Sequence, residues 1–377
     1  MAARRGQSEG SIYRRQNGLW AGAVDLGRVN GRRVRKTFYG ATRKEVQERV
    51  TAALRDQQLG SLAHAGRETV GQFLTAWLVD FASPNLRPLT IESYRSLVDL
   101  HLIPALGHIR LDRLSPQQVQ AMLNAKLAGG LSARRVGYIR AVLRAALNQA
   151  IRWGLLARNA ASLSNPPRVV RHPVEILSPD DARRFLQVAQ GDRFEALYTV
   201  ALSLGLRQGE ALGLRWQDVD LTARTLSVVH ALQRVDGKLQ LVEPKTDRSR
   251  RTIKMPAVVA DALAQHRVQQ LEMRLLAGAR WTETGLIFTS SLGTPLDGAN
   301  VTRHFQRLLA SAGLPRLRFH DLRHSCASLL LAQGIPARVV METLGHSQIS
   351  LTLNTYSHVM PALQGEAADA IDRVFGR

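Results

Sequence analysis

The segment Phe319–His324 carries two histidines and an arginine at the start of an expected helix. The apolar pattern that follows predicts a helix that continues through Leu331 and stops at Gly334. His320 and Arg323 are three residues apart, so their side chains project from one side of the first turn. Backbone N–H groups and the helix dipole also favour an anion at that end. The spacing therefore predicts a phosphate site.

A metal site is the alternative interpretation of these histidines. His320 and His324 have no obvious third ligand in the zinc-protease pattern, and no matching cysteine or carboxylate spacing accompanies them. The chain's single cysteine, Cys326, lies in an apolar run, so we expect it in the core and not as a nucleophile. The residue types favour phosphate over metal.

Arg207 follows the end of an apolar helix at Leu202–Leu206, where a buried element reaches a turn. An arginine there can grip a phosphate through two parallel hydrogen bonds, a geometry that lysine cannot offer. Alternatively, Arg207 and Glu210 pair with each other across three helical positions. On this motif alone the ion pair is the simpler interpretation.

Lys245 lies between two runs of strand character, Lys238–Glu243 and Arg251–Met255. The pattern predicts a hairpin with Lys245 at its tip. An ammonium at such a tip can lie beside a bound backbone and donate a proton to a leaving oxygen. A lone lysine in a polar turn is more often simply solvated.

A helix expected over 336–344 places His346 just beyond its end. Tyr356 follows in a short segment that begins at Ser350. On its own this tyrosine would be an ordinary amphipathic side chain at a helix surface.

Taken together, these motifs resemble the active-site set of the tyrosine recombinases, the phage integrase family. The resemblance is strong over residues 174–360, and Gln208 occupies a variable place in the first motif. The most specific matches are residues 205–210, 320–324, 344–347 and 355–358. The matching active-site positions, none of them missing, are Arg207, Lys245, His320, Arg323, His346 and Tyr356.

The resemblance implies that the oxygen of Tyr356 attacks the scissile phosphate, giving a 3′-phosphotyrosyl link and a free 5′-hydroxyl. Arg207 and Arg323 would hold the non-bridging oxygens and stabilise charge on the phosphorus. Because bond energy is conserved, the resemblance implies no cofactor, neither ATP nor a metal ion. The sequence agrees in having no Gly-rich Walker pattern.

The remaining roles also follow from the resemblance. Lys245 would be the general acid, and His320 would assist proton transfer at the nucleophile. His346 would donate a hydrogen bond to the phosphate, and Glu210 would position its neighbours.

Composition points to a polyanionic partner. The chain has 377 residues, 51 Lys and Arg against 30 Asp and Glu, a net charge of +21 and a pI of about 11.3. That surplus favours nucleic acid. Because no apolar run approaches bilayer-spanning length, we expect no membrane association. The resemblance implies a cytoplasmic, nucleoid-associated protein in a bacterial host.

The first 62 residues concentrate charge, with 13 basic and 5 acidic residues. Short β-compatible runs separated by Asn17-Gly18 and Asn30-Gly31 predict a small three-stranded sheet. A helix should follow, opened by Thr42 and Glu45 as a capping box. A solvated basic surface is the alternative to DNA contact. The candidate contacts in a major groove are Arg14, Arg15, Arg33, Arg35 and Lys36.

The pattern of residues 67–165 predicts helices. Ser115 and Gln118 should form a capping box at the start of one of them, and a long helix should span 132–153. Three prolines then predict a linker over 164–173. The expected fold is multidomain: a small N-terminal sheet with a helix, an all-α domain, and a mainly α domain with a small antiparallel sheet. The resemblance makes these an arm-site-binding domain (1–62), a core-site-binding domain (67–165) and a catalytic domain (174–377).

The partners implied are double-stranded DNA attachment sites of core and arm type, bound by a homotetramer. A directionality factor and a host DNA-bending protein are further partners of such enzymes. The rival interpretations are a type IB topoisomerase, a chromosome-dimer-resolving recombinase, a non-enzymatic DNA-binding regulator and a metal-dependent transposase. The basic N-terminal segment argues against the topoisomerase and the dimer-resolving recombinase. The ordered set of site residues argues against a regulator without catalytic activity, and the lack of clustered carboxylates argues against the transposase.

Overall fold

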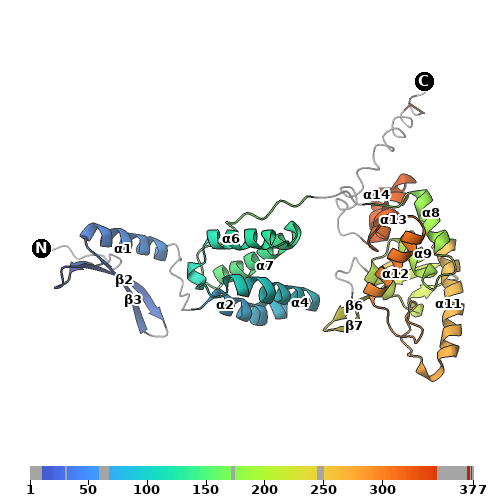
Figure 1. Cartoon of the computed structure of the whole chain (residues 1–377), viewed down its shortest axis with the longest axis horizontal. Coiled ribbons are helices and arrows are strands. Elements are labelled where there is room, and N and C mark those ends of the chain that lie inside the picture. Colours follow the sequence, from blue (N-terminus) through green and yellow to red (C-terminus); the bar gives the residue numbers. More distant parts are fainter. Residues whose placement is uncertain are drawn as a thin grey trace. The chain divides into compact units, whose positions relative to one another are not determined.

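The structure is a computed structural model of the 377-residue chain, and it describes residues 11–29, 32–58, 68–170, 175–243, 250–345, 372, 373 and 375. The chain divides into two compact units, residues 1–171 and 172–377 (Figure 1). The division falls within the proline-containing stretch. In the described ranges, no helix has the length and apolar character needed to cross a membrane.

An antiparallel sheet opens the first unit. Its strands β1 (Ser11–Arg14), β2 (Trp20–Val29) and β3 (Arg32–Gly40) pair in sequence order, as the short β-compatible runs predict. Helix α1 (Arg43–Gln58) packs its buried Val46 and Val50 onto one face of this sheet.

The start of α1 is capped almost as expected. The backbone N–H of Glu45 donates to the hydroxyl of Thr42 (3.2 Å), but the carboxylate of Glu45 accepts from the N–H of Ala41, one residue before the expected partner (3.1 Å). The helix start is therefore confirmed, with the reciprocal bond shifted by one residue.

The rest of the first unit is helical. Its helices are α2 (Val70–Trp77), α3 (Ser83–Asn85), α4 (Pro88–Leu97), α5 (Ile103–Leu106), α6 (Pro116–Ala128) and α7 (Ala133–Arg152). Short π-helical turns, Leu78–Ala82 and Val98–Leu102, continue α2 into α3 and α4 into α5, and a 3-10 turn spans Leu111–Arg113. The expected capping box of Ser115 and Gln118 at α6 is confirmed, with both reciprocal hydrogen bonds present. Apolar faces at helical spacing meet in one core.

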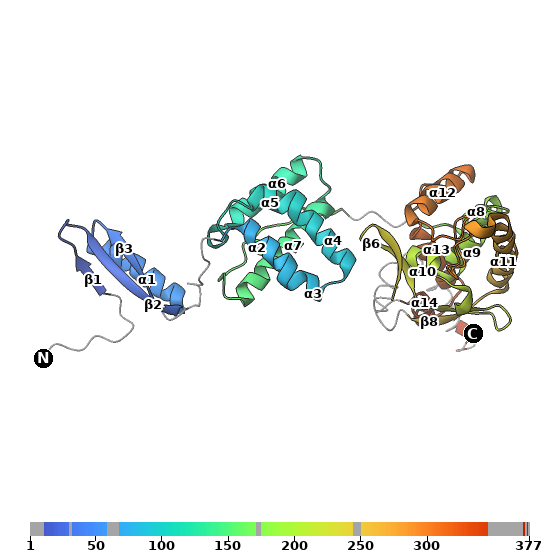
Figure 2. The same ribbon diagram turned by 90° about the horizontal axis from the view of Figure 1, so that it is seen from below.

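The second unit is mainly helical. Its helices are α8 (Pro179–Val188), α9 (Glu195–Leu204), α10 (Gln208–Leu212), α11 (Ala257–Ala277), α12 (Gly298–Ser311), α13 (Asp321–Ala332) and α14 (Ala337–Leu344). Single 3-10 turns span Trp216–Asp218 and Gly278–Arg280. Helix α9 is buried along most of its length, and α10, α11 and α13 pack against it (Figure 2). Helix α14 packs in turn on α13. This is the fold class that the sequence predicts.

Five short strands complete the described part of this unit: β4 (Val219–Asp220), β5 (Thr225–Val228), β6 (Ala231–Val235), β7 (Lys238–Val242) and β8 (Arg251–Lys254). They form two antiparallel sheets, β4-β5-β8 and β6-β7. The expected hairpin between β7 and β8 is wrong, because β7 pairs with β6 while β8 pairs with β5. Lys245, which was expected at its tip, lies outside the described residues.

Candidate active site

The turn after α9 is the first element of the site. Gly205 ends α9 with a φ of +61°, in the left-handed region that favours glycine. A Cβ at this position would come within 2.2 Å of the Leu344 side chain. Glycine therefore lets the end of α9 lie directly against the end of α14, and Arg207 follows two residues later as the N-cap of α10.

Arg207 and Glu210 form the ion pair that the spacing allows. Nη1 of Arg207 donates to Oε1 of Glu210 (2.5 Å), and the backbone N–H of Arg207 donates to Oε2 (3.1 Å). The pair leaves the Arg207 side chain 40% exposed, whereas that of Glu210 is only 5% exposed. The two interpretations of Arg207 are thus compatible, because the ion pair orients a guanidinium that still reaches solvent.

Glu210 carries its negative charge inside the protein. Burial by itself raises the pKa of this carboxyl, but the charges of Arg251 and Arg207 and their hydrogen bonds outweigh it and lower the pKa below its ordinary value. Arg251, at the start of β8, donates from Nη2 to Oε2 of Glu210 (3.0 Å). The carboxylate is therefore held between one buried and one half-exposed guanidinium.

Arg323 reaches the same turn from α13. Its side chain is almost fully buried, at 1% exposed, and Nη1 donates to the carbonyl oxygen of Gly205 (2.8 Å). Two arginines that are 116 residues apart in sequence, Arg207 and Arg323, are in this way drawn to one short stretch of backbone.

His320 lies at the N-cap of α13, beside this pair of arginines. Its ring reaches solvent, but the protein packed around it and the positive charges of His324, Arg323 and Arg207 lower its pKa to about 4. The rings of His320 and His324 meet edge to face with centroids 4.9 Å apart. His320 is therefore neutral at neutral pH and can accept a proton.

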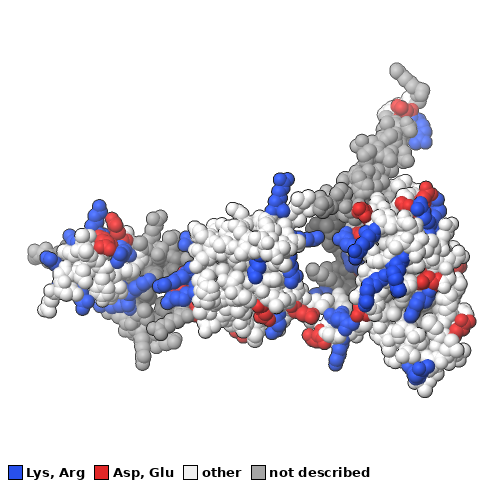
Figure 3. Space-filling model, viewed as in Figure 1, with Lys and Arg blue, Asp and Glu red and all other residues white. Residues whose placement is uncertain are grey.

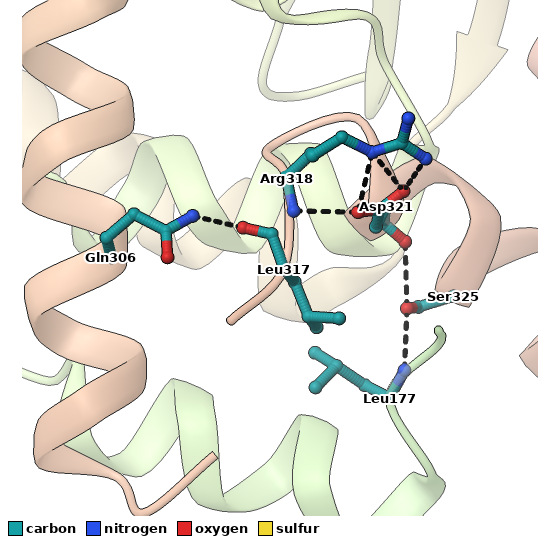
Figure 4. Close-up of polar contacts among 6 residues, drawn as sticks. All are labelled: Leu177, Gln306, Leu317, Arg318, Asp321 and Ser325. Atoms are coloured by element: carbon teal, nitrogen blue, oxygen red, sulfur yellow. Dashed lines mark hydrogen bonds and ion pairs between the residues drawn. The ribbon is translucent and has the colours of Figure 1, made fainter. Parts of the chain in front are cut away.

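Backbone and side-chain contacts anchor the start of α13 (Figure 4). The backbone N–H of Arg318 and its guanidinium both donate to the buried carboxylate of Asp321 (2.7 Å each at closest). Ser325 donates to the carbonyl oxygen of Asp321 (2.9 Å) and accepts from the N–H of Leu177 (2.9 Å). These contacts fix the first turn of α13, which carries His320 and Arg323.

The side chain of Gln306 and the backbone of Leu317 belong to the same anchor. The amide of Gln306, on α12, donates to the carbonyl oxygen of Leu317 in the segment that leads into α13 (Figure 4). The segment before His320 is thereby tied to a neighbouring helix as well as to α13 itself.

The assembled set is cationic, with a buried carboxylate as its counter-charge. Arg207 and Arg323 lie near enough to the neutral His320 for their charges to act on its ring. On the face drawn in Figure 3, Lys and Arg side chains lie on each described part of the chain. Guanidinium groups that are fixed in advance bind and stabilise a phosphoryl group without reorganising.

Family models match most of this chain. Residues 175–362 match the phage integrase family, and residues 69–127 match the N-terminal SAM-like domain of phage integrases. An integrase of Streptomyces ambofaciens is 31% identical over 100% of this chain and 99% of its own length. This chain belongs to the phage integrase family. It is a site-specific tyrosine recombinase of a phage or mobile element.

Two further proteins place this recombinase among its relatives. A XerC-like tyrosine recombinase of Caldanaerobacter subterraneus subsp. tengcongensis is 30% identical over 93% of this chain and 95% of its own. The Tn1549 transposon integrase, solved in complex with transposon right end DNA, superposes with a TM-score of 0.69 at 23% identity, over 80% of this chain and 99% of that one. The latter likeness concerns the fold.

The described part of the recombinase contains half of the sequence-predicted active-site positions. It brings Arg207, His320 and Arg323 together, with Glu210 as the buried partner of Arg207. The other three positions, Lys245, His346 and Tyr356, lie outside the described residues. Their roles stay predictions.

Cys326 lies in the core of the recombinase, as expected. It is 2% exposed, and burial raises the pKa of its thiol to about 12. Within the described ranges, no group of three or more His, Cys, Asp or Glu side chains is arranged to hold a metal ion.

The candidate DNA contacts near the N-terminus lie on different faces of the sheet. Phe38 and Gly22 face each other across β3 and β2, and Gly22 packs against α1, so Lys36 shares the α1 side of β3 while Arg35 lies on the opposite side. All four candidates whose side chains are described are exposed: Arg14, Arg15, Arg35 and Lys36.

The guanidinium of Arg15 lies 5.5 Å from the ring centroid of Tyr39. The side chain of Arg33 lies outside the described set. The face of the sheet that α1 does not cover is the one that remains open to a DNA groove.

Two residues that support the site, Arg251 and Asp321, were not predicted from the sequence. Arg251 stands in a basic run with Arg248 and Arg250, so its residue type gave no signal. Asp321 was noted only as part of a motif, although its position three residues after Arg318 is the spacing of a helix-start ion pair.

Proposed function

We propose that this recombinase cleaves and rejoins DNA through a 3′-phosphotyrosyl link to Tyr356. The observation that carries the proposal is the hydrogen bond from Arg323 to the carbonyl oxygen of Gly205, which brings the two arginines of the motifs to one turn. A pair of fixed guanidinium groups matches the two non-bridging oxygens of a phosphodiester.

The chemistry balances without an external energy source. The oxygen of Tyr356 attacks phosphorus, the bond from phosphorus to the 5′-oxygen breaks, and one phosphodiester replaces another. The proton of the phenol passes to the neutral His320, and Lys245 protonates the leaving 5′-oxygen. In the second step, the 5′-hydroxyl of a partner strand attacks the phosphotyrosine and releases Tyr356.

The other site residues act on the phosphate or on its arginines. Arg207 and Arg323 hold the non-bridging oxygens and stabilise the charge that develops there. His346 donates a hydrogen bond to the phosphate, and Glu210 holds Arg207 in position. No cofactor takes part in this scheme.

Each of the three parts of the chain has its own role on DNA. Residues 174–377 catalyse, residues 67–165 hold the core-type attachment site, and residues 1–62 hold arm-type sites through Arg14, Arg15, Arg33, Arg35 and Lys36. Exposure of the described members of this set supports the last assignment. Phosphate contacts of this type make binding strongly dependent on salt.

The active assembly is a homotetramer on DNA. Recombination of two duplexes breaks four strands, and each break uses one Tyr356, so four copies are needed. A directionality factor and a host DNA-bending protein would bias the reaction between integration and excision. The protein acts on the bacterial nucleoid, in the cytoplasm.

A suicide substrate tests the proposal. This DNA carries a nick next to the cleavage site, so the short fragment that bears the new 5′-hydroxyl diffuses away and the covalent complex accumulates. The wild-type protein should give a denaturant-resistant protein–DNA adduct, and Tyr356→Phe should bind the same DNA without forming one. An adduct of equal yield in Tyr356→Phe would refute the assignment of the nucleophile.

A further inference from the structure

Arg251 is a buried arginine that the scheme above does not use. Its side chain is 8% exposed, although it stands at the edge of a short strand, β8. A guanidinium enters a protein interior at a high cost in solvation, so its partners must compensate that cost. Among the described residues, these partners include Glu210 on α10 and Thr343 on α14.

One partner of Arg251 is Glu210. Nη2 of Arg251 donates to Oε2 of Glu210 (3.0 Å), the oxygen that also accepts from the backbone N–H of Arg207. Oε1 of the same carboxylate accepts from the side chain of Arg207. Glu210 therefore holds Arg207 at two points while Arg251 holds Glu210.

A second described partner is the end of α14. Nε of Arg251 donates to the carbonyl oxygen of Thr343 (2.8 Å), in the last turn of the helix. Carbonyl groups there have no partner within the helix and carry the negative end of its dipole, so a cation is favoured. Gly345 ends α14 with a φ of +69°, and a Cβ there would come within 3.0 Å of Nη1 of Arg251.

We propose that Arg251 is a positioning residue for the phosphate site: it fixes Glu210, and through it Arg207, against the end of the helix that precedes His346. The proposal rests on the proposed function, because Arg207 must bind the scissile phosphate for its position to matter. A planar guanidinium donates in two directions at once, toward Glu210 and toward Thr343. A lysine offers a single charged point, so it keeps the charge and loses the geometry.

The variant Arg251→Lys tests this role on two suicide substrates. One has an ordinary scissile phosphodiester, and the other has a neutral methylphosphonate at that position. Removal of the negative charge makes cleavage depend less on the guanidinium of Arg207. We expect adduct formation by Arg251→Lys at saturating protein to be at least about tenfold slower than wild type on the phosphodiester and within about threefold on the methylphosphonate.

Arg215→Lys is the matched control. Arg215 is also a partly buried arginine of the second unit and forms a two-point ion pair with Asp218, but that pair lies within one turn and contacts neither Glu210 nor α14 in the described residues. Its adduct rates should stay within about twofold of wild type on both substrates, and both variants should bind DNA as the wild type does.

Equal slowing of Arg251→Lys on the two substrates would overturn the proposal, because a loss of general stability slows both alike. A wild-type rate on the phosphodiester would overturn it too. If Arg251→Lys does not fold, Glu210→Gln replaces it. The neutral amide removes the negative charge that links Arg251 to Arg207, so this variant should show the same dependence on substrate. Failure of the proposed function looks different: the wild-type protein itself then forms no adduct on either DNA.

Discussion

Arg323, buried in the first turn of α13, donates a hydrogen bond from Nη1 to the carbonyl oxygen of Gly205 (2.8 Å). Gly205 is the left-handed residue at which α9 ends. This bond ties the side chain of Arg323 to the backbone turn that precedes Arg207, so the position of Arg323 depends on the turn that carries Arg207. Several consequences can be measured.

The Gly205→Ala substitution should destabilise the protein strongly. Alanine in the left-handed region costs about 1–2 kcal/mol, and the clash of its Cβ with Leu344 adds about 1–3 kcal/mol of overpacking. Gly191→Ala is the control, because Gly191 has a φ of +76° and no atom within 4 Å of an added Cβ. Urea unfolding of both variants measures the difference, and equal losses would contradict the proposed role of the close contact.

The ring of His320 should stay neutral well below neutral pH. The protein packed around the ring, together with the charges of His324, Arg323 and Arg207, lowers its pKa to about 4. Because the unfolded chain has an ordinary histidine pKa of about 6.5, it binds more protons than the folded chain between these values, so His320 lowers stability as the pH falls through that window.

An NMR titration of the histidine Cε1 protons checks this pKa. The resonance that disappears in His320→Gln identifies the residue. A midpoint near about 6.5 in the DNA-free protein would show that the neighbouring charges do not act on the ring as described.

The Lys245→Ala variant should lose the general acid. We expect adduct formation to slow by about 10²–10⁴-fold on ordinary DNA. A substrate with sulfur in place of the 5′-bridging oxygen should restore most of the rate, because a thiolate leaves without needing a proton. Exposed Lys238, on β7, gives the control variant Lys238→Ala. A loss of equal size on both substrates would remove Lys245 from this role.

A chain without residues 1–62 should separate cleavage from integration. The deletion removes a net charge of +8, from 13 basic and 5 acidic residues, together with the sheet that we assign to arm sites. Cleavage of core-site DNA should persist, while integration between two attachment sites should fall. Normal integration by the shortened chain would refute this division of labour.

Local patterns predicted much of the fold and part of the site. A capping box marked the start of α6 and the helical pattern marked α13, because those signals act over three or four residues. The hairpin between β7 and β8 failed for the opposite reason. Both strands pair with partners elsewhere, and alternation along a strand does not reveal its neighbour.

Arg251 was not predicted because its contacts, too, are with residues far away in the sequence. Its hydrogen-bond partners Glu210 and Thr343 are 41 and 92 residues away in sequence. No pattern in the local run of arginines distinguishes a buried member from a solvated one. Only the folded chain shows which guanidinium meets the carboxylate of Glu210.

The most direct test of the central claim identifies the residue that carries the DNA. Trypsin and nuclease digestion of the trapped adduct should leave a nucleotide on the peptide 339–373, which contains a single tyrosine, Tyr356. Tandem mass spectrometry then locates the added mass. A nucleotide on Tyr356 is the predicted result, and a nucleotide on any other residue, or no covalent adduct from active wild-type protein, would contradict the account.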